Sequence, residues 1–216
     1  MSGPAMNKNP RIALSIAISP LLLVLSACNQ EPVQPSLSEA PLAGAAIGGD
    51  FTLTDQNGKK RTWKEFDGQY RIVYFGYTNC PDICTPDMQN LMAGLKAFEK
   101  TKPELAAKIQ PIFITVDPKR DTPDVLKQFV GAFHSRALGL SGTDAEIADA
   151  AKKFAIYSSR VEGSSPENYL MSHSQTPYLM GPDGKPIAIL PADQPNTDAN
   201  EGAPKLVEAE LEKWVR

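Results

Sequence analysis

The sequence predicts an α/β domain in which a central mixed β-sheet is flanked by helices. Between about residues 71 and 161, apolar β-prone runs alternate with segments whose apolar residues follow the helical repeat. This alternation is typical of a sheet with a parallel centre. Two hairpin signals, Asn57-Gly58 and Pro182-Asp183-Gly184, add antiparallel strands. We therefore expect one β-hairpin as an N-terminal extension and another late in the chain.

The strands are predicted from runs of β-branched and aromatic residues. The N-terminal hairpin joins residues 51–54 to residues 61–63. Residues 71–77 and 108–116 are nearly continuous in apolar residues, which predicts two buried central strands. Shorter strands are predicted at residues 138–140, 154–161, 178–180 and 186–190.

The helices are predicted from capping residues and apolar faces. The first has Thr85 as its N-cap and Pro86 at its first helical position. The second has Pro123 just inside a cap formed by either of the two preceding residues, and the third opens with a capping box at residues 143–146. The apolar faces of these helices and of a C-terminal helix consist of Met88, Leu91, Met92, Leu95, Phe98, Leu126, Phe129, Val130, Phe133, Ile147, Ala150, Ala151, Val207, Leu211 and Trp214.

The N-terminus has the layout of a secretory signal. Lys8 and Arg11 precede an apolar run at residues 12–25, which is too short for a good transmembrane helix. Cys28 directly follows Leu-Ser-Ala, an arrangement that resembles the bacterial lipoprotein processing box, in which the cysteine is lipidated. We therefore predict a lipoprotein-type signal peptide at residues 1–27, with an uncleaved membrane anchor as the alternative.

Both alternatives tether the protein to a membrane and place its bulk outside the cytoplasm. Residues 28–48 are rich in Pro, Ala, Ser and Gly and lack periodic hydrophobicity, which predicts a flexible tether. Residues 49–216 then form the folded domain. Oxidising conditions outside the cytoplasm would allow a disulfide bond between cysteines.

The charge of the chain argues against one class of function, and its size argues against a stabilising role for the cysteine pair. The chain has 216 residues, and residues 1–27 hold two of its 22 basic residues and none of its 25 acidic ones. The remainder is mildly acidic and unpatterned, which argues against nucleic-acid binding. A domain of this size buries an adequate core without disulfide bonds, so Cys80 and Cys84 are not expected to serve stability.

Cys80 and Cys84 lie where the first central strand gives way to a helix, which is the placement found in thioredoxin-like proteins. A helix start stabilises a thiolate, and a spacing of four puts both sulfurs on one side of the first turn. Such a pair can form a disulfide or bind a soft metal ion. Three residues separate the cysteines instead of the two of thioredoxin-type reductases, and Asn79 stands where an aromatic residue is usual. Both differences favour metal binding.

A third ligand has to come from one of two histidines. His134 lies near a predicted helix end and is expected to be a surface or capping residue, whereas His173 precedes a predicted core strand beside the cysteine pair. Two thiolates and one imidazole suit Cu(I), while Cu(II) and Zn(II) need further ligands.

Four other side chains are candidate ligands by residue type: Asp117, Met88, Met92 and Met171. Asp117 is expected to organise its own loop with Arg120 and Thr122 more readily than to bind metal. The two methionines of the first helix are assigned to the core. Met171 remains a candidate because it lies two residues before His173.

Three segments together resemble the Sco/SenC family: residues 77–84 (YTNCPDIC), residues 117–123 (DPKRDTP) and residues 173–184, which begin with His-Ser and end with YLMGPDG. They occur in the family's order and spacing within residues 51–216. The family usually has proline where this chain has Thr85. Pro177 lies close to where thioredoxin-like oxidoreductases carry a cis-proline, and we predict a trans peptide bond there.

The resemblance implies a membrane-tethered thioredoxin-like domain that binds copper through Cys80, Cys84 and His173. It also implies delivery of copper, as Cu(I) or Cu(II), to the binuclear copper centre of cytochrome c oxidase. The predicted partner is the copper-bearing oxidase subunit, with another copper chaperone or a thioredoxin-like reductase as further partners. The predicted location is the bacterial cell envelope, lipid-anchored on the periplasmic side of the inner membrane.

Two functions from different classes follow. The first is a non-enzymatic copper chaperone that transfers the ion by ligand exchange, with a Cys80–Cys84 disulfide preventing loading. The alternative is a thiol-disulfide reductase that keeps the partner's cysteines reduced, with Cys80 as the exposed nucleophile. A peroxide-reducing or copper-sensing protein is a third hypothesis.

Overall fold

A computed structural model describes residues 1–3, 34–163, 165, 168–194 and 200–216. Residues 34–216 form one compact unit, and residues 1–33 fall outside it. Cys28 and, apart from residues 1–3, the predicted signal peptide lie outside the described residues. Within the described part, no helix is long and apolar enough to cross a membrane.

The central sheet has seven strands in the order β2-β1-β5-β4-β3-β8-β9. Their bounds are β1 Thr52–Asp55, β2 Lys60–Thr62, β3 Tyr70–Gly76, β4 Ile109–Thr115, β5 Leu138–Ser141, β8 Tyr178–Met180 and β9 Pro186–Ile189. Strands β3, β4 and β5 pair in parallel, and both hairpins add antiparallel strands at the two sides. The predicted α/β fold with a mixed sheet and two hairpins is therefore confirmed.

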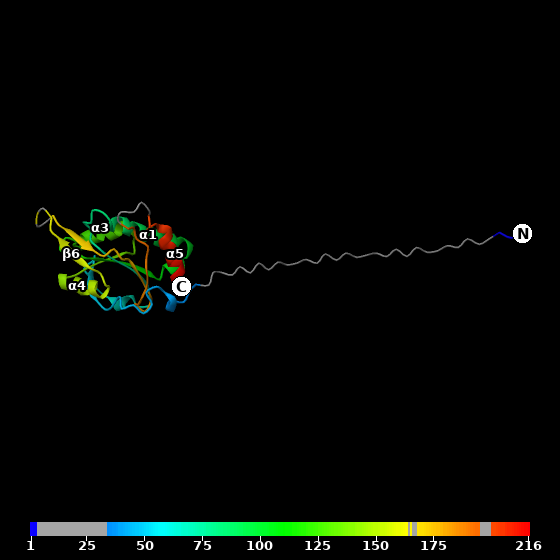
Figure 1. Ribbon diagram of the computed structural model, residues 1–216, viewed down its shortest axis with the longest axis horizontal. Coiled ribbons are helices and arrows are strands. Elements are labelled where there is room, and N and C mark those ends of the chain that lie inside the picture. Colours follow the sequence, from blue (N-terminus) through cyan, green and yellow to red (C-terminus); the bar gives the residue numbers. More distant parts are fainter. Residues whose placement is uncertain (4–33, 164, 166–167, 195–199) are drawn as a thin grey trace. The chain divides into compact units, whose positions relative to one another are not determined.

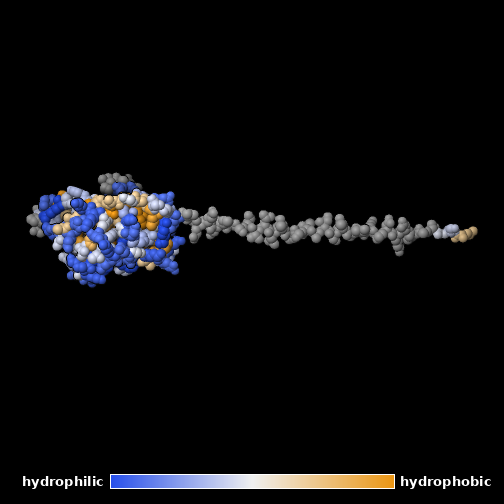
Figure 2. Space-filling view, turned by 90° about the horizontal axis from the view of Figure 1, so that it is seen from below, coloured by the Kyte–Doolittle hydropathy of each residue, from blue (hydrophilic) through white to orange (hydrophobic). Residues whose placement is uncertain are grey.

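Helices cover both faces of this sheet, which explains why its central strands are apolar throughout. Figure 1 shows α1 (Cys84–Thr101), α3 (Pro123–Phe133) and α5 (Pro204–Trp214) on one side and α4 (Asp144–Lys153) on the other. Two short helical elements, α2 (Pro103–Ala106) and η2 (Trp63–Phe66), lie in the connections. All seven residues of β3 are buried. Hydrophilic residues cover most of the domain face seen in Figure 2.

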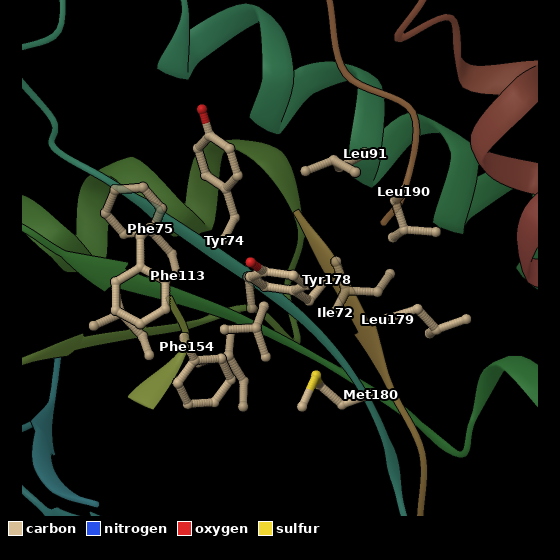
Figure 3. Close-up of a cluster of buried hydrophobic side chains, with 14 of the residues drawn as sticks. Ile72, Tyr74, Phe75, Leu91, Phe113, Phe154, Tyr178, Leu179, Met180 and Leu190 are labelled. Carbon is tan, nitrogen blue, oxygen red and sulfur yellow. The ribbon is translucent and has the colours of Figure 1, made fainter. Parts of the chain in front are cut away.

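The core that results supports the loop that follows β3. Side chains of β3 pack between Leu91 of α1 and Phe154, which follows α4 (Figure 3). Helices α1 and α5 approach closely because Gly94 has no side chain: a Cβ there would lie 2.6 Å from Cβ of Val207. The middle of α1 is thereby packed directly against α5.

The capping predictions are confirmed for two helices and wrong for one. Thr122 caps α3 by accepting a hydrogen bond from the backbone N–H of Val125, and Thr143 forms the capping box of α4. Helix α1, however, begins at Cys84, and its N-cap is Ile83, which makes no side-chain capping bond. The second cysteine is therefore already a helical residue.

One predicted strand differs from the observed pattern. The strand expected at residues 154–161 is shorter, β6 (Ser158–Val161), and pairs with β7 (Leu170–His173) in a separate two-stranded sheet. Phe154 is instead the C-cap of α4 and is fully buried in the core. Its apolar ring is shielded from water there, whereas the strand β6 is partly exposed.

The tether predicted at residues 28–48 does not match the structure of residues 34–48. Ala40 is buried, and the backbone N–H of Leu42 donates to the carbonyl of Ile187 at 3.0 Å. The 3₁₀ helix η1 (Leu37–Glu39) has its own capping box at Ser36. The compact unit therefore begins at Gln34 and not at residue 49. Scattered apolar residues of this segment pack against the core although they show no periodicity in the sequence.

Candidate metal centre

Three elements from distant parts of the chain converge on one point. Cys80 lies in the loop that follows β3, Cys84 is the first residue of α1, and His173 is the last residue of β7. Their ligand atoms all lie within 4.8 Å of one another, and Cys84 Sγ is 3.2 Å from His173 Nε2. Within the residues that the structure describes, this is the one group of at least three His, Cys, Asp or Glu side chains that could hold a metal ion.

The position of His173 differs from the prediction, although its contacts do not. We expected a loop residue before a core strand, whereas His173 ends β7, where it pairs with Ser158. Its Nδ1 lies 3.0 Å from the carbonyl oxygen of Ser174. Because a carbonyl only accepts, Nδ1–H is the donor in this contact, which leaves Nε2 as the ring nitrogen that faces Cys84. A metal ion at the two sulfurs would therefore be bound through Nε2.

Two aromatic rings fix the plane of the imidazole. The ring of Tyr77 meets that of His173 edge to face at 5.9 Å, and that of Tyr74 does so at 6.4 Å. The hydroxyl of Tyr74 points toward α1 (Figure 3) and donates to Oδ2 of Asp87 at 2.7 Å. Both tyrosines belong to or directly follow the buried strand β3, so the imidazole is positioned by the core.

The two cysteines have opposite protonation preferences. The pKa of Cys80 is lowered to about 3, first by the hydrogen bond from Cys84, against the effect of burial, and further by His173 and by backbone N–H groups at the start of α1. One of these, the N–H of Cys84, lies 3.4 Å from Cys80 Sγ. The same hydrogen bond and burial raise the pKa of Cys84 above its usual range. The reduced metal-free pair therefore holds one thiolate, on half-exposed Cys80, and one thiol, on fully buried Cys84.

A buried aspartate anchors the loop that carries Cys80. Asp121 accepts hydrogen bonds from the backbone N–H of Thr78 at 3.0 Å, from the hydroxyl of Thr78 at 2.6 Å and from the hydroxyl of Thr115 at 2.6 Å. Burial raises the pKa of Asp121, while these three bonds oppose the rise. Asp121 was predicted only as one of two candidate caps of α3, and the cap is Thr122.

Asp117 does not contribute to the group of ligand atoms. Its two oxygens accept hydrogen bonds from the hydroxyl of Tyr169 and from Nε of Arg120. The expected pairing with Arg120 is therefore confirmed, whereas Thr122 is engaged in capping α3. Sequence reasoning missed Tyr169, for which the available signal was an aromatic residue four positions before His173.

A cavity of about 320 Å³ opens beside Cys80. One wall is the loop from Cys80 to Ile83, and the other is the hairpin β6–β7, including Met171. Met171 is half-buried and lines this cavity, so its thioether lies near the site. Met88 and Met92 are buried in the core as expected.

His134 is remote from this group, as expected, but it is not a surface residue. It is the C-cap of α3 and only 4% exposed, with Nε2 at 3.2 Å from a carboxylate oxygen of Glu99. Burial lowers the pKa of His134. The prediction of a capping histidine is confirmed, while its burial follows from a long-range contact with α1. All described peptide bonds are trans, including the one before Pro177.

Comparison with known proteins identifies the family. The sequence profile of the SCO1/SenC family matches residues 39–208. The chain belongs to the SCO1/SenC family. A SCO2-like protein of Rickettsia felis is 38% identical over 183 residues, which cover 81% of this chain and 83% of that protein.

Solved structures agree with this assignment and with the thioredoxin-like fold. The structure of Bradyrhizobium japonicum ScoI with copper bound is 36% identical, has a TM-score of 0.67, and covers 79% of this chain and all of that one. BsSco, in which a disulfide switch was identified, is described as a member of the Sco family of cytochrome c oxidase assembly proteins. It is 27% identical with a TM-score of 0.51, over 67% of this chain and 82% of that one.

Proposed function

We propose that the protein binds one copper ion through Cys80, Cys84 and His173 and delivers it to the binuclear copper centre of cytochrome c oxidase. The observation that carries the proposal is the approach of two sulfurs and one imidazole nitrogen to within 4.8 Å of one another. Membership of a family with copper-bound and oxidase-assembly members supports it. The donor set is soft and three-coordinate, which suits Cu(I).

The same residues indicate how the ion would be released. Cys84 is fully buried, whereas Cys80 and His173 are half-exposed and line the cavity beside the hairpin. An incoming thiolate of the oxidase subunit would reach the copper from this cavity and replace Cys80 or His173 first. Cys84 would be the last ligand to leave. Transfer is then a series of ligand exchanges in which the ion is never free.

The decisive experiment measures Cu(I) affinity by competition with a chelator. The fully reduced protein is compared with His173→Ala and with His134→Gln, which changes the other histidine of the chain. We expect one-to-one binding, a loss of more than about 100-fold in His173→Ala because a direct ligand is removed, and little change in His134→Gln. Equal affinities for all three proteins would overturn the three-ligand site.

A thiol-disulfide reductase is the second candidate, and one observation favours it. Cys80 holds a thiolate at neutral pH next to a protonated Cys84, which is the arrangement of a nucleophilic and a resolving thiol. In that case the reduced protein would reduce a disulfide in a peptide bearing the oxidase copper ligands, and His173→Ala would retain this activity. Loss of copper binding without loss of reduction would separate the two functions.

The anchoring and location extend the proposal beyond the folded domain. Lipidation of Cys28 would hold the domain at the periplasmic face of the inner membrane, within reach of the oxidase. Labelling with a fatty-acid analogue, compared between the wild type and Cys28→Ala, tests the anchor. Membrane fractionation tests the location, and copper loading of a purified oxidase subunit tests the partner.

A further inference from the structure

His173 reaches the cysteines from a hairpin that is not part of the main sheet. Strands β6 and β7 pair only with each other among the described strands. Exposure alternates along β7, so Leu170 and Ser172 face outward while Met171 and His173 face the domain. Without ladder hydrogen bonds to the seven-stranded sheet, the position of the hairpin depends on side-chain contacts.

The densest of these contacts surround Tyr169, the residue directly before β7. Its hydroxyl donates to Asp117 Oδ1 at 2.7 Å, and its carbonyl accepts from Arg120 Nη1 at 2.9 Å. The guanidinium of Arg120 lies 3.6 Å from the centre of the Tyr169 ring, and that of Arg160 lies 4.0 Å from it. We call Asp117, Arg120, Tyr169 and Arg160 the Tyr169 clamp.

The clamp is connected to the imidazole through Tyr77. The guanidinium of Arg120 lies 5.7 Å from the centre of the Tyr77 ring. Tyr77 in turn meets the ring of His173 edge to face at 5.9 Å. Arg120 therefore contacts both Tyr169, the residue directly before β7, and Tyr77, whose ring orients the imidazole of His173.

We propose that the Tyr169 clamp holds the hairpin β6–β7 in the position that brings His173 to the cysteines. Tyr169 and Arg120 are then positioning residues of the metal centre, although neither donates an atom to it. The inference rests on the proposed function only in assuming that His173 is a ligand. Outer groups that orient a ligand commonly change metal affinity by about 10–100-fold, because a misplaced imidazole has to be repositioned at every binding event.

Two variants of Tyr169 separate the contribution of its ring to the clamp from that of its hydroxyl. Tyr169→Leu removes the hydroxyl and the ring, and we expect a Cu(I) affinity about 10–100-fold below that of the wild type. Tyr169→Phe keeps the ring and its contacts with both guanidinium groups and should recover most of the loss. The matched control is Tyr157→Leu, which changes a tyrosine at the same hairpin that is 63% exposed. This control should bind as the wild type does.

A double-mutant cycle separates positioning from general destabilisation. If the clamp acts through His173, Tyr169→Leu should cause no further loss of Cu(I) affinity in a His173→Ala background. An equal fold-loss in both backgrounds would assign Tyr169 a structural role alone and overturn the proposal. Thermal unfolding of each variant verifies that the protein measured is folded.

A metal-free readout keeps the clamp testable if copper binding fails. In the reduced apo protein, NMR contacts between the ring protons of His173 and Tyr77 should be present in the wild type and in Tyr157→Leu, and lost in Tyr169→Leu. Contacts that persist in Tyr169→Leu would refute the clamp. If the contacts are lost while His173→Ala leaves copper binding unchanged, the clamp stands and the three-ligand site is wrong.

Discussion

The thiolate of Cys80 offers a quantitative test of the electrostatics at the site. Its pKa of about 3 has the hydrogen bond from Cys84 as the largest cause. Replacing Cys84 with alanine removes that donor, so the pKa of Cys80 should rise toward the ordinary value of about 8.5. Replacement with serine keeps a hydroxyl donor at the same position and should preserve much of the lowering. The two variants differ in one oxygen atom.

The expected rates follow from two opposing effects. Near pH 6 a fully ionised Cys80 has about 300 times the thiolate fraction of an ordinary thiol. Its lower basicity reduces the rate per thiolate by about the same factor, since the Brønsted slope for attack on a disulfide is about 0.45. Relative to glutathione, Cys80 should therefore react about equally near pH 6, about tenfold faster near pH 5 and about tenfold slower near pH 7.

The assay is reaction of the reduced, metal-free protein with a dipyridyl disulfide, with glutathione measured in the same buffers. The wild-type rate should stay nearly flat relative to reagent controls between about pH 5 and pH 8 and fall only as the pH approaches the pKa of about 3. The Cys84→Ala rate should instead increase with pH over this range, and Cys84→Ser should lie between the two. A wild-type rate that increases about tenfold per pH unit from pH 5 to pH 8 would show an ordinary thiol and refute the reasoning.

Two further predictions concern the supports of the site. Asp121→Ala should lower the free energy of unfolding by about 3 kcal/mol in urea titrations, because the backbone N–H of Thr78 and two hydroxyls lose a buried acceptor; a change within about 0.5 kcal/mol would mean that water replaces the carboxylate. A Cβ at Gly76 would lie 3.2 Å from Cys84 Sγ and closer still to two aromatic rings. Gly76→Ala should therefore cost about 1–3 kcal/mol of stability and weaken Cu(I) binding, and unchanged copper affinity would show that the sulfur can move aside.

The parts of the fold that were predicted correctly are those in which local sequence and tertiary environment agree. Strand β3 is apolar at nearly every position because both of its faces are covered, and α4 begins at a capping box that closes locally. In each case the information that determines the element lies within about ten neighbouring residues. The order of the cysteines, the strand and the helix could be derived in the same way.

The errors occur where long-range contacts decide. The apolar residues of segment 154–161 suggested one strand, but Phe154 is drawn into the core and only Ser158–Val161 remains extended. Residues 34–48 showed no periodicity, yet they pack against β9 and α5. His134 is buried because Glu99, thirty-five residues earlier on α1, pairs with it. Patterns of spacing carry no signal of such partners.

The candidate site lies between these two cases. Cys80 and Cys84 could be assigned from their spacing, but the hydrogen bonds that make their pKa values diverge depend on the third residue and on helix α1 starting two residues earlier than expected. His173 could be chosen from its place in the chain, whereas its orientation depends on Tyr169 and Arg120, whose mutual contacts span 49 residues. The convergence of Cys80, Cys84 and His173 could be predicted from the sequence, whereas the orientation of His173 could not.

The difference between the local cysteine pair and the distant histidine bears on how the two proposed functions, copper binding and disulfide exchange, could share one site. The pair Cys80 and Cys84 alone would suffice for disulfide exchange, since the thiolate lies in the loop before α1 and the thiol at the first residue of α1, within hydrogen-bonding distance. The proposed copper site would additionally require His173, and therefore the position of a hairpin that is held by side chains. A change that displaces the hairpin should leave disulfide exchange at Cys80 nearly intact while weakening copper binding. The hairpin is thus the part of the molecule through which a partner could convert a copper-loaded site into a dithiol.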